Sequence, residues 1–177
     1  MLGPGDGTLS VRTKRAGAAA KAGHNLLLRV TSWEARLALG TDPTDTSVEL
    51  DVDATSLRVL EGTGGMQALG DDDKANIEKT IDDEVLKRKA ITFRSSEVQP
   101  AAGGSGLSVR GDLMLLGTSH PLAFDVAVLE GGALSAVAVV KQTDWGMKPY
   151  SALFGALKVV DEVEVEIEVH LPAPQSL

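Results

Sequence analysis

The feature that most constrains the fold is an alternation of apolar and polar residues with a period of two. The clearest case is segment 163–171, in which three valines, an isoleucine and a leucine alternate with three glutamates and His170. In segment 47–53, two valines and a leucine alternate with acidic residues in the same way. Because successive side chains of a strand point to opposite faces, each segment predicts a strand with one buried and one solvated face, as in antiparallel sheets.

Segments with this pattern predict eight strands in all. They are 8–13, 26–39, 47–53, 90–98, 107–116, 121–128, 133–141 and 163–171. In the second of them the apolar phase slips by one residue at Ser32, which predicts a β-bulge inside one long strand. Gly131 and Gly132 predict a tight hairpin turn between two of the later strands.

Two segments favour helices. Segment 71–89 starts with three aspartates and carries Ile77, Ile81 and Val85 at helical spacing, which predicts one longer helix. Segment 15–22 is short, rich in alanine and ends at Gly23, which predicts a short helical turn.

The chain has 177 residues, a length typical of one domain, and we expect residues 1–177 to form a single one. We predict a mainly β fold, an eight-stranded antiparallel lipocalin-like barrel with one longer helix and short helical turns. Such a barrel is either filled by side chains or holds one small ligand. Only six aromatic residues are available to fill it, which favours a cavity slightly over a packed interior.

Composition limits the function classes. The formal net charge of −8 argues against a nucleic-acid partner, and the absence of cysteine excludes disulfides and thiol nucleophiles. The three histidines lack the close spacing of metal-ligand motifs, and no G-x-S-x-G segment is present. We therefore expect no catalytic residue, no metal site and no cofactor.

No apolar run approaches the roughly 20 residues of a membrane-spanning helix, so we expect no membrane span. Segment 1–7 has neither the basic nor the apolar part of a secretory signal, from which we expect a cytoplasmic protein.

Several motifs in order carry a resemblance to a known family. They lie at 23–30, 48–57, 89–96, 109–113 with 116–122, and 143–147 followed by 161–169. In them a histidine precedes an early strand, an Ile-Thr-Phe-Arg-Ser stretch follows the longer helix, and an Asp-Trp-Gly element precedes the last strand. On these motifs the chain resembles the YceI-like family of lipocalin-like, polyisoprenoid-binding barrels over nearly its whole length.

The resemblance implies that a long apolar chain, such as an isoprenoid quinone or a polyprenyl lipid, threads the barrel. We expect this lipid to be bound without any enzymatic reaction. The side chains expected to face it from the strands are Leu26, Leu28, Val30, Val48, Leu50, Phe93, Phe124, Val165 and Ile167.

Segment 142–157 holds three of the six aromatic residues and reads as an apolar loop with one helical turn. One interpretation is that it caps an end of the barrel. The other is that Trp145, Met147, Tyr150 and Phe154 line the cavity mouth, with Lys148 meeting an anionic head group. The alternative function is a structural barrel with a packed interior, in which 145–157 docks a protein partner, a homodimer being one case.

Overall fold

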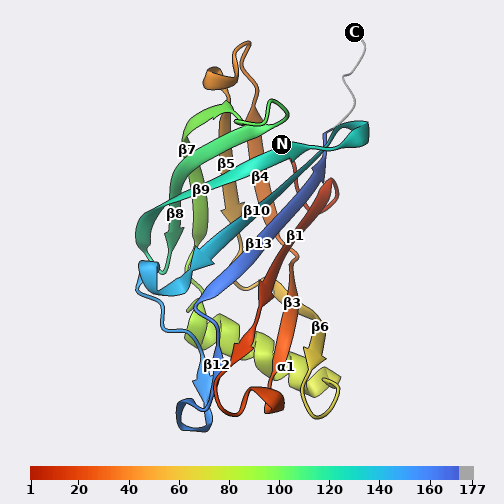
Figure 1. The fold of residues 1–177 in the computed structure, drawn as a ribbon, viewed down its shortest axis with the longest axis vertical. Helices are drawn as coiled ribbons and strands as arrows, with labels where there is room; N and C mark the ends of the chain where they lie inside the picture. Colours follow the sequence, from red (N-terminus) through yellow and green to blue (C-terminus); the bar gives the residue numbers. More distant parts are fainter. Residues whose placement is uncertain (172–177) are drawn as a thin grey trace.

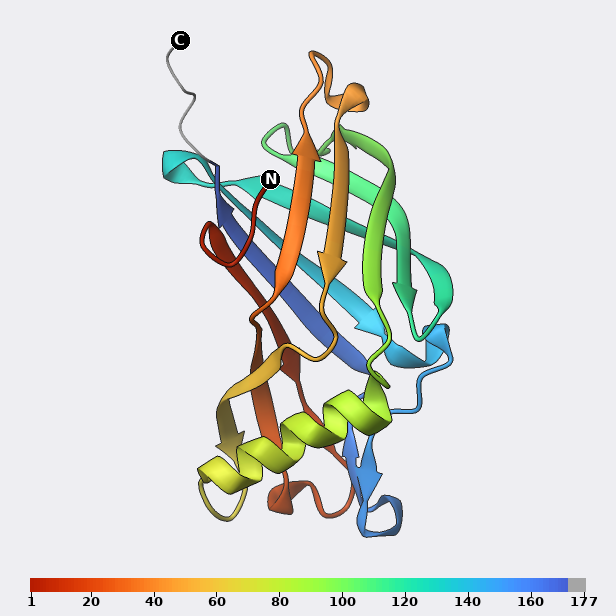
Figure 2. The ribbon, with the colours of Figure 1, turned by 180° about the vertical axis from the view of Figure 1, so that it is seen from behind.

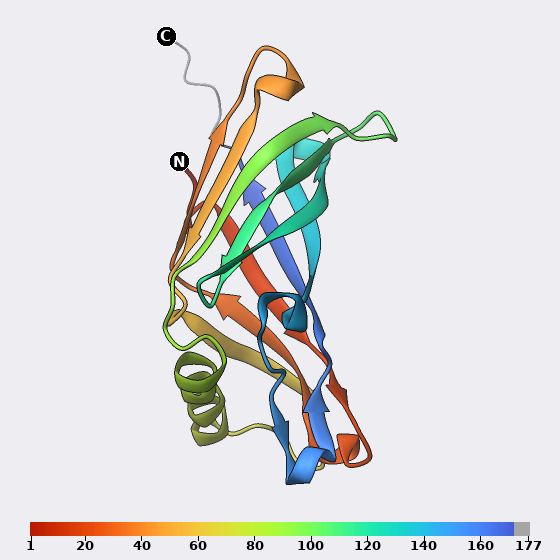
Figure 3. The ribbon, with the colours of Figure 1, turned by 90° about the vertical axis from the view of Figure 1, so that its left-hand side faces the viewer.

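The computed structural model describes residues 1–171 and is mainly β (Figure 1). Ten strands form the large sheet: β1 Gly7–Thr13, β3 His24–Val30, β4 Trp33–Ala38, β5 Ser47–Val52, β6 Leu57–Gly64, β7 Ile91–Pro100, β8 Leu107–Leu115, β9 Thr118–Val128, β10 Ala133–Lys141 and β13 Glu162–His170. All their pairings are antiparallel, in the order β4-β5-β7-β8-β9-β10-β13-β1-β3-β6. The sheet curls so strongly that β4 and β5 lie opposite β10 and β13 (Figure 3).

A second, smaller sheet lies at one end of the molecule. It has the order β11-β12-β2, with β11 at Ser151–Ala152, β12 at Leu157–Val159 and β2 at Arg15–Ala16. The helix α1, Asp71–Thr80, lies across from this small sheet (Figure 2). We call this part of the molecule, with α1 and the small sheet, the α1 end.

The predicted mainly β, antiparallel fold with one longer helix is confirmed, but the predicted eight-stranded barrel is wrong, because the large sheet has ten strands and forms a half-barrel. Its edge strands, β4 and β6, are covered by other segments instead of pairing with each other. Leu2 pairs with Ala35 on β4 through two backbone hydrogen bonds of 2.8 and 2.9 Å. On β6, the Val59 N–H donates to Glu78 Oε1 of α1 at 2.9 Å. Covering an edge in this way satisfies its free backbone groups and discourages pairing with another chain.

The predicted bulge at Ser32 is a break between two strands. β3 pairs with β1 and β6, whereas β4 pairs with β5 at the other edge of the sheet. The break is fastened by Ser56, whose hydroxyl accepts from the Ser32 N–H at 3.1 Å and whose carbonyl accepts from the Thr31 N–H at 3.0 Å. When a chain moves from one edge of a sheet to the other, its alternation of apolar and polar residues can shift by one residue, as it does at Ser32.

The longer helix predicted over 71–89 is confirmed, although it ends at Val85. α1 begins at the aspartate cluster, where Asp73 accepts from the Gly70 N–H at 3.0 Å, and it continues as a π-helical turn over Ile81–Val85. An acidic first turn is favourable because the helix dipole is positive there. In segment 15–22 only Ala20–Ala22 are helical, as one 3-10 turn, because Arg15–Ala16 pair with β12.

The hairpin predicted at Gly131 and Gly132 is confirmed. Both glycines have left-handed φ angles, 82° and 83°, and they join β9 to β10. The Leu129 N–H donates to the Ala133 carbonyl at 2.8 Å across this turn. Glycine adopts such angles without a steric penalty, so the sequence marks the turn clearly.

Candidate functional site

The half-barrel encloses a cavity of about 630 Å³. All ten strands of the large sheet and α1 contribute side chains to its wall, and most of these side chains are apolar. A volume of this size lies in the range of small-molecule sites in proteins. The cavity agrees with the favoured prediction and not with the alternative of a packed interior.

The alternation in the last strand builds one side of this wall. Val163, Val165 and Ile167 of β13 line the cavity. The glutamates between them face outward, where Glu166 accepts from Arg12 Nε at 2.7 Å. The strand therefore has one face for the cavity and one for solvent, as its sequence predicts.

Strands β5, β7 and β9 build another part of the wall in the same way. Leu50 of β5 lines the cavity, and its neighbour Asp51 accepts from Arg94 Nη2 outside at 2.6 Å. The rings of Phe93 and Phe124, on β7 and β9, pack with their centroids 5.3 Å apart at an angle of 53°. Tilted packing of this kind is favourable for aromatic rings and makes this part of the wall well defined.

Eleven of the thirteen side chains predicted to contact a ligand line this cavity. They are Leu26, Leu28, Val30, Val48, Leu50, Phe93, Phe124, Met147, Tyr150, Val165 and Ile167. Their common placement follows from the strand alternation and from the return of segment 147–150 along the cavity. That they bind a ligand stays a prediction.

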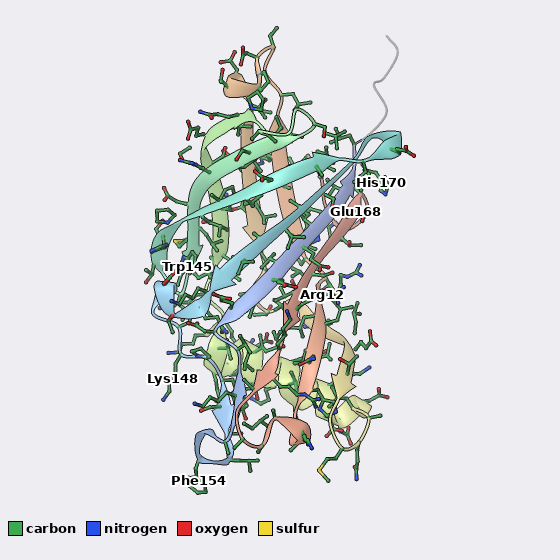
Figure 4. The ribbon with its side chains drawn as sticks, viewed as in Figure 1. Arg12, Trp145, Lys148, Phe154, Glu168 and His170 are labelled. Atoms are coloured by element: carbon green, nitrogen blue, oxygen red, sulfur yellow. The ribbon has the colours of Figure 1, made fainter. Side chains whose placement is uncertain are left out.

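The placement of Trp145 and Phe154 at the cavity mouth is wrong. The Trp145 side chain is 3% exposed, donates from Nε1 to the Leu113 carbonyl at 2.7 Å and packs edge-on against His120, outside the cavity. Phe154 lies in the turn between β11 and β12 and projects from the molecule into solvent (Figure 4). Lys148 is also exposed and does not line the cavity.

Segment 142–159 borders the cavity at its α1 end. It contains a 3-10 turn at Gln142–Trp145, followed by β11 and β12. Met147, Tyr150 and Leu157 of this segment reach the cavity. The segment is thus part of the wall, and it does not fill the interior as a plug would.

Polar lining residues gather at the α1 end. They include Arg15, His24, Asn76, Thr80, Tyr150 and Lys158, whereas Arg36 on β4 and Ser135 on β10 are polar lining residues elsewhere in the wall. Five lining residues are exposed to solvent, and four of these, Ala22, Asn76, Tyr150 and Lys158, belong to this end. The cavity therefore has a polar mouth at the α1 end and an apolar body inside the large sheet.

Hydrogen bonds hold Arg15 and His24 of this mouth in place. The Arg15 guanidinium donates to the Gly23 carbonyl, and the Arg15 N–H donates to Asn25 Oδ1 at 3.0 Å. His24 Nε2 lies 2.7 Å from the Gln67 carbonyl oxygen. Sequence reasoning missed Arg15 and Lys158, because the mouth forms only when β2 pairs with β12.

The described residues offer neither a metal-binding cluster nor a membrane-spanning helix. Within residues 1–171, no group of three or more His, Asp or Glu side chains is arranged to hold a metal ion. The same residues contain no helix with the length and apolar character needed to span a membrane.

A family model and several solved structures match this chain. The model of the YceI-like domain family matches residues 8–171. The crystal structure of BcnA from Burkholderia cenocepacia is 17% identical with a TM-score of 0.68, over 92% of this chain and 94% of that one. The YCEI protein of Campylobacter jejuni is 13% identical with a TM-score of 0.57, over 80% and 81%. At these identities the likeness shows the fold. No curated protein matches the chain in sequence.

Proposed function

The chain belongs to the YceI-like domain family, and from this premise we propose that it binds a lipid with a long apolar chain, of isoprenoid or quinone type, inside its half-barrel. Binding would serve transport, storage or sequestration of the lipid, and no step of it requires a catalytic residue. The observation that carries the proposal is the continuous apolar wall around a cavity of about 630 Å³.

The driving force is the removal of hydrocarbon from water. Burial of each methylene group contributes about 0.8 kcal/mol, before the cost of ordering the ligand is subtracted. The wall is already formed by paired strands, so little protein ordering opposes binding. A long tail is therefore favoured over a short one.

The two parts of the cavity suggest one orientation for the lipid. An apolar tail fits the body formed by β5, β7, β9 and β13, where the lining is apolar. A polar head fits the mouth at the α1 end, beside Arg15 and Lys158. Two cationic side chains there favour an anionic head group over a neutral one.

Two neighbouring residues of β10 provide a matched test. Ala138 lines the cavity, whereas Val137 points outward and is 53% exposed. An indole at position 138 would occupy space that the tail needs, and an indole at 137 would extend into solvent. We therefore expect Ala138→Trp to lower lipid binding about tenfold or more, equivalent to at least about 1.4 kcal/mol, and Val137→Trp to leave it unchanged.

The measurement is lipid retention through gel filtration. Delipidated protein is incubated with a polyprenyl quinone in mild detergent, separated from free lipid, extracted and quantified, with circular dichroism as a check of folding. Wild type and Val137→Trp should each retain about one lipid per chain. The proposal fails if the wild type retains none, or if both tryptophan variants retain the same amount.

A further inference from the structure

The α1 end combines two stretches of sequence that contain no acidic residue. Segments 7–33 and 145–160 lack both Asp and Glu, in a chain with 25 such residues. The fold brings the two segments together: the Ala19 N–H donates to the Ala156 carbonyl at 2.8 Å, and the Val160 N–H donates to the Lys14 carbonyl at 2.8 Å. A basic surface therefore forms on a protein of formal net charge −8.

The cations of this surface have no acidic partner in the described structure. Lys21, Lys148 and Lys158 are exposed, and Arg15 is half-buried. Within residues 1–171, none of the four has a carboxylate oxygen within 4 Å of its side-chain nitrogens. These charges are therefore free to meet anions from outside the molecule.

An apolar tip projects from the same surface. Phe154 is 112% exposed and Leu153 is 58% exposed, in the turn between β11 and β12. Both residues have left-handed φ angles, 55° and 52°, which residues other than glycine seldom adopt. Phe154 and Lys148 both point away from the ribbon in this part of the molecule (Figure 4). The fold thus presents a large aromatic side chain to solvent beside basic groups.

We propose that this surface docks on an anionic lipid bilayer. Phe154 and Leu153 insert between the head groups, and Lys21, Lys148 and Lys158 contact the lipid phosphates. Aromatic side chains favour the membrane–water interface, and lysines near an anionic bilayer surface add electrostatic attraction. The combination of unpaired cations with an exposed apolar tip selects an anionic bilayer over a neutral surface.

Acidic residues limit the orientation of docking. The first turn of α1 carries Asp71–Asp73, and it lies away from the β11–β12 turn, on the other side of this end (Figure 2). An anionic bilayer repels this turn, so the molecule approaches with the β11–β12 side first. Tyr150 and Lys158, which line the cavity mouth, are on that approaching side.

Docking in this orientation places the cavity mouth against the bilayer. A lipid tail could then pass between bilayer and cavity without crossing water, which is the costly step for hydrocarbon. This part of the inference rests on the proposed lipid binding, whereas docking itself rests only on the surface.

The test is cosedimentation with vesicles of phosphatidylcholine alone and of phosphatidylcholine with phosphatidylglycerol in equal parts. We expect the wild type to sediment with the anionic vesicles and not with the neutral ones. Raising the salt concentration should release it, because screening weakens the attraction. Equal binding to both vesicle types, or binding to neither, overturns the proposal.

Matched variants locate the surface. Lys21→Glu with Lys148→Glu should weaken binding about tenfold or more, and Phe154→Ser should weaken it severalfold. The charge control is Lys87→Glu with Lys89→Glu, which gives the same net charge elsewhere, and the apolar control is Leu39→Ser, also exposed. Both controls should bind as the wild type does, and an equal loss in the controls overturns the assignment.

Two further readouts separate this proposal from its alternatives. Retention of quinone delivered in detergent should be unchanged in the docking variants, so a failure of docking and a failure of lipid binding are distinguishable. Light scattering should show a monomer. A dimer that dissociates in Phe154→Ser would assign the tip to a second copy of the chain and overturn the proposal.

Discussion

The wall of the half-barrel and the cavity mouth differ in how their cations are partnered. On the wall, several outward cations meet carboxylates of neighbouring strands, as Arg12 meets Glu166 at 2.7 Å and Arg94 meets Asp51 at 2.6 Å. At the α1 end, Arg15 and Lys158 have no such partner in the described structure, although both line the cavity mouth. Exposed ion pairs contribute little to stability, whereas an unpaired cation at a cavity mouth is available to a ligand.

The same contrast holds for apolar residues. In the wall, apolar side chains alternate with charged ones and face the cavity, where they would hold a tail through its hydrocarbon alone. At the α1 end, polar side chains gather around the opening. Affinity for a lipid would therefore come mainly from the wall, and selectivity for its head group from the α1 end.

The largest expected effect comes from adding a methyl group to the wall at Gly111, where the neighbouring strand leaves no room for one. A Cβ at Gly111 on β8 would lie 2.2 Å from the Arg94 carbonyl oxygen and 2.7 Å from Cζ of Phe93. We expect Gly111→Ala to lower the free energy of unfolding by about 3 kcal/mol, because neither the strand backbone nor the ring can yield cheaply. Urea unfolding measures this change.

Gly103 provides the matched control for this variant. It lies in the turn between β7 and β8, and a Cβ there meets nothing within 4 Å. We expect Gly103→Ala to change the free energy of unfolding by less than about 0.5 kcal/mol. If the two alanine variants prove equally stable, the wall is less tightly packed than its geometry indicates.

A smaller effect sharpens the role of the mouth. Lys158→Met keeps the length of the side chain and removes its charge at the cavity mouth. We expect binding of a polyprenyl phosphate to weaken about fivefold, equivalent to about 1 kcal/mol, and binding of a polyprenyl quinone to change little. Lys148→Met is the control, because Lys148 is exposed but does not line the cavity. If Lys158→Met weakens binding of both lipids equally, Lys158 does not recognise the head group.

The smallest effect concerns the link between β10 and β13. Asp161 accepts from Thr143 Oγ1 at 2.5 Å and from the Thr143 N–H at 2.9 Å, and these hydrogen bonds lower the pKa of Asp161 below its ordinary value of 3.8. The folded protein therefore favours the ionised carboxylate of Asp161 over the protonated form. The resulting stability is present above pH 3.8 and is lost as the pH falls through the lower, folded pKa.

Asp161→Asn tests this sign. We expect the variant to lose less stability than the wild type when the pH is lowered below about 4, as measured by urea unfolding at several pH values. The control is Asp125→Asn, at an exposed aspartate on β9. A wild type and an Asp161→Asn variant with the same pH dependence would show that the two hydrogen bonds do not matter for stability.

The sequence predicts the wall better than the α1 end, and the reason is the range of the interactions involved. The alternation in β5 and β13 is local, so their inward residues could be identified without a structure. The sequence pattern does not predict strand β6, because Leu60, Glu61 and Gly62 interrupt the alternation and because the strand forms by pairing with β3. The edge strands of the sheet are β4 and β6. The break at Ser32 sends β3 and β4 to different edges, so the open form of the sheet depends on it.

The mouth depends on contacts between residues far apart in the chain. Ala16 pairs with Lys158, and no local pattern indicates this register. Trp145 and Phe154 each precede a glycine in the same apolar segment. Trp145 is nevertheless buried and donates a hydrogen bond to the Leu113 carbonyl, whereas Phe154 is fully exposed. The available sequence signal is the absence of acidic residues from 7–33 and 145–160, which does not show by itself that the segments meet.

The central claim is that the half-barrel holds one lipid by its tail, and native mass spectrometry tests it most directly. Delipidated protein is incubated with a polyprenyl quinone and transferred to volatile buffer before measurement. The account predicts one added mass equal to that of the quinone, present in the wild type and greatly reduced in Ala138→Trp. A wild type that shows only the mass of the bare chain, at every quinone concentration, would contradict it.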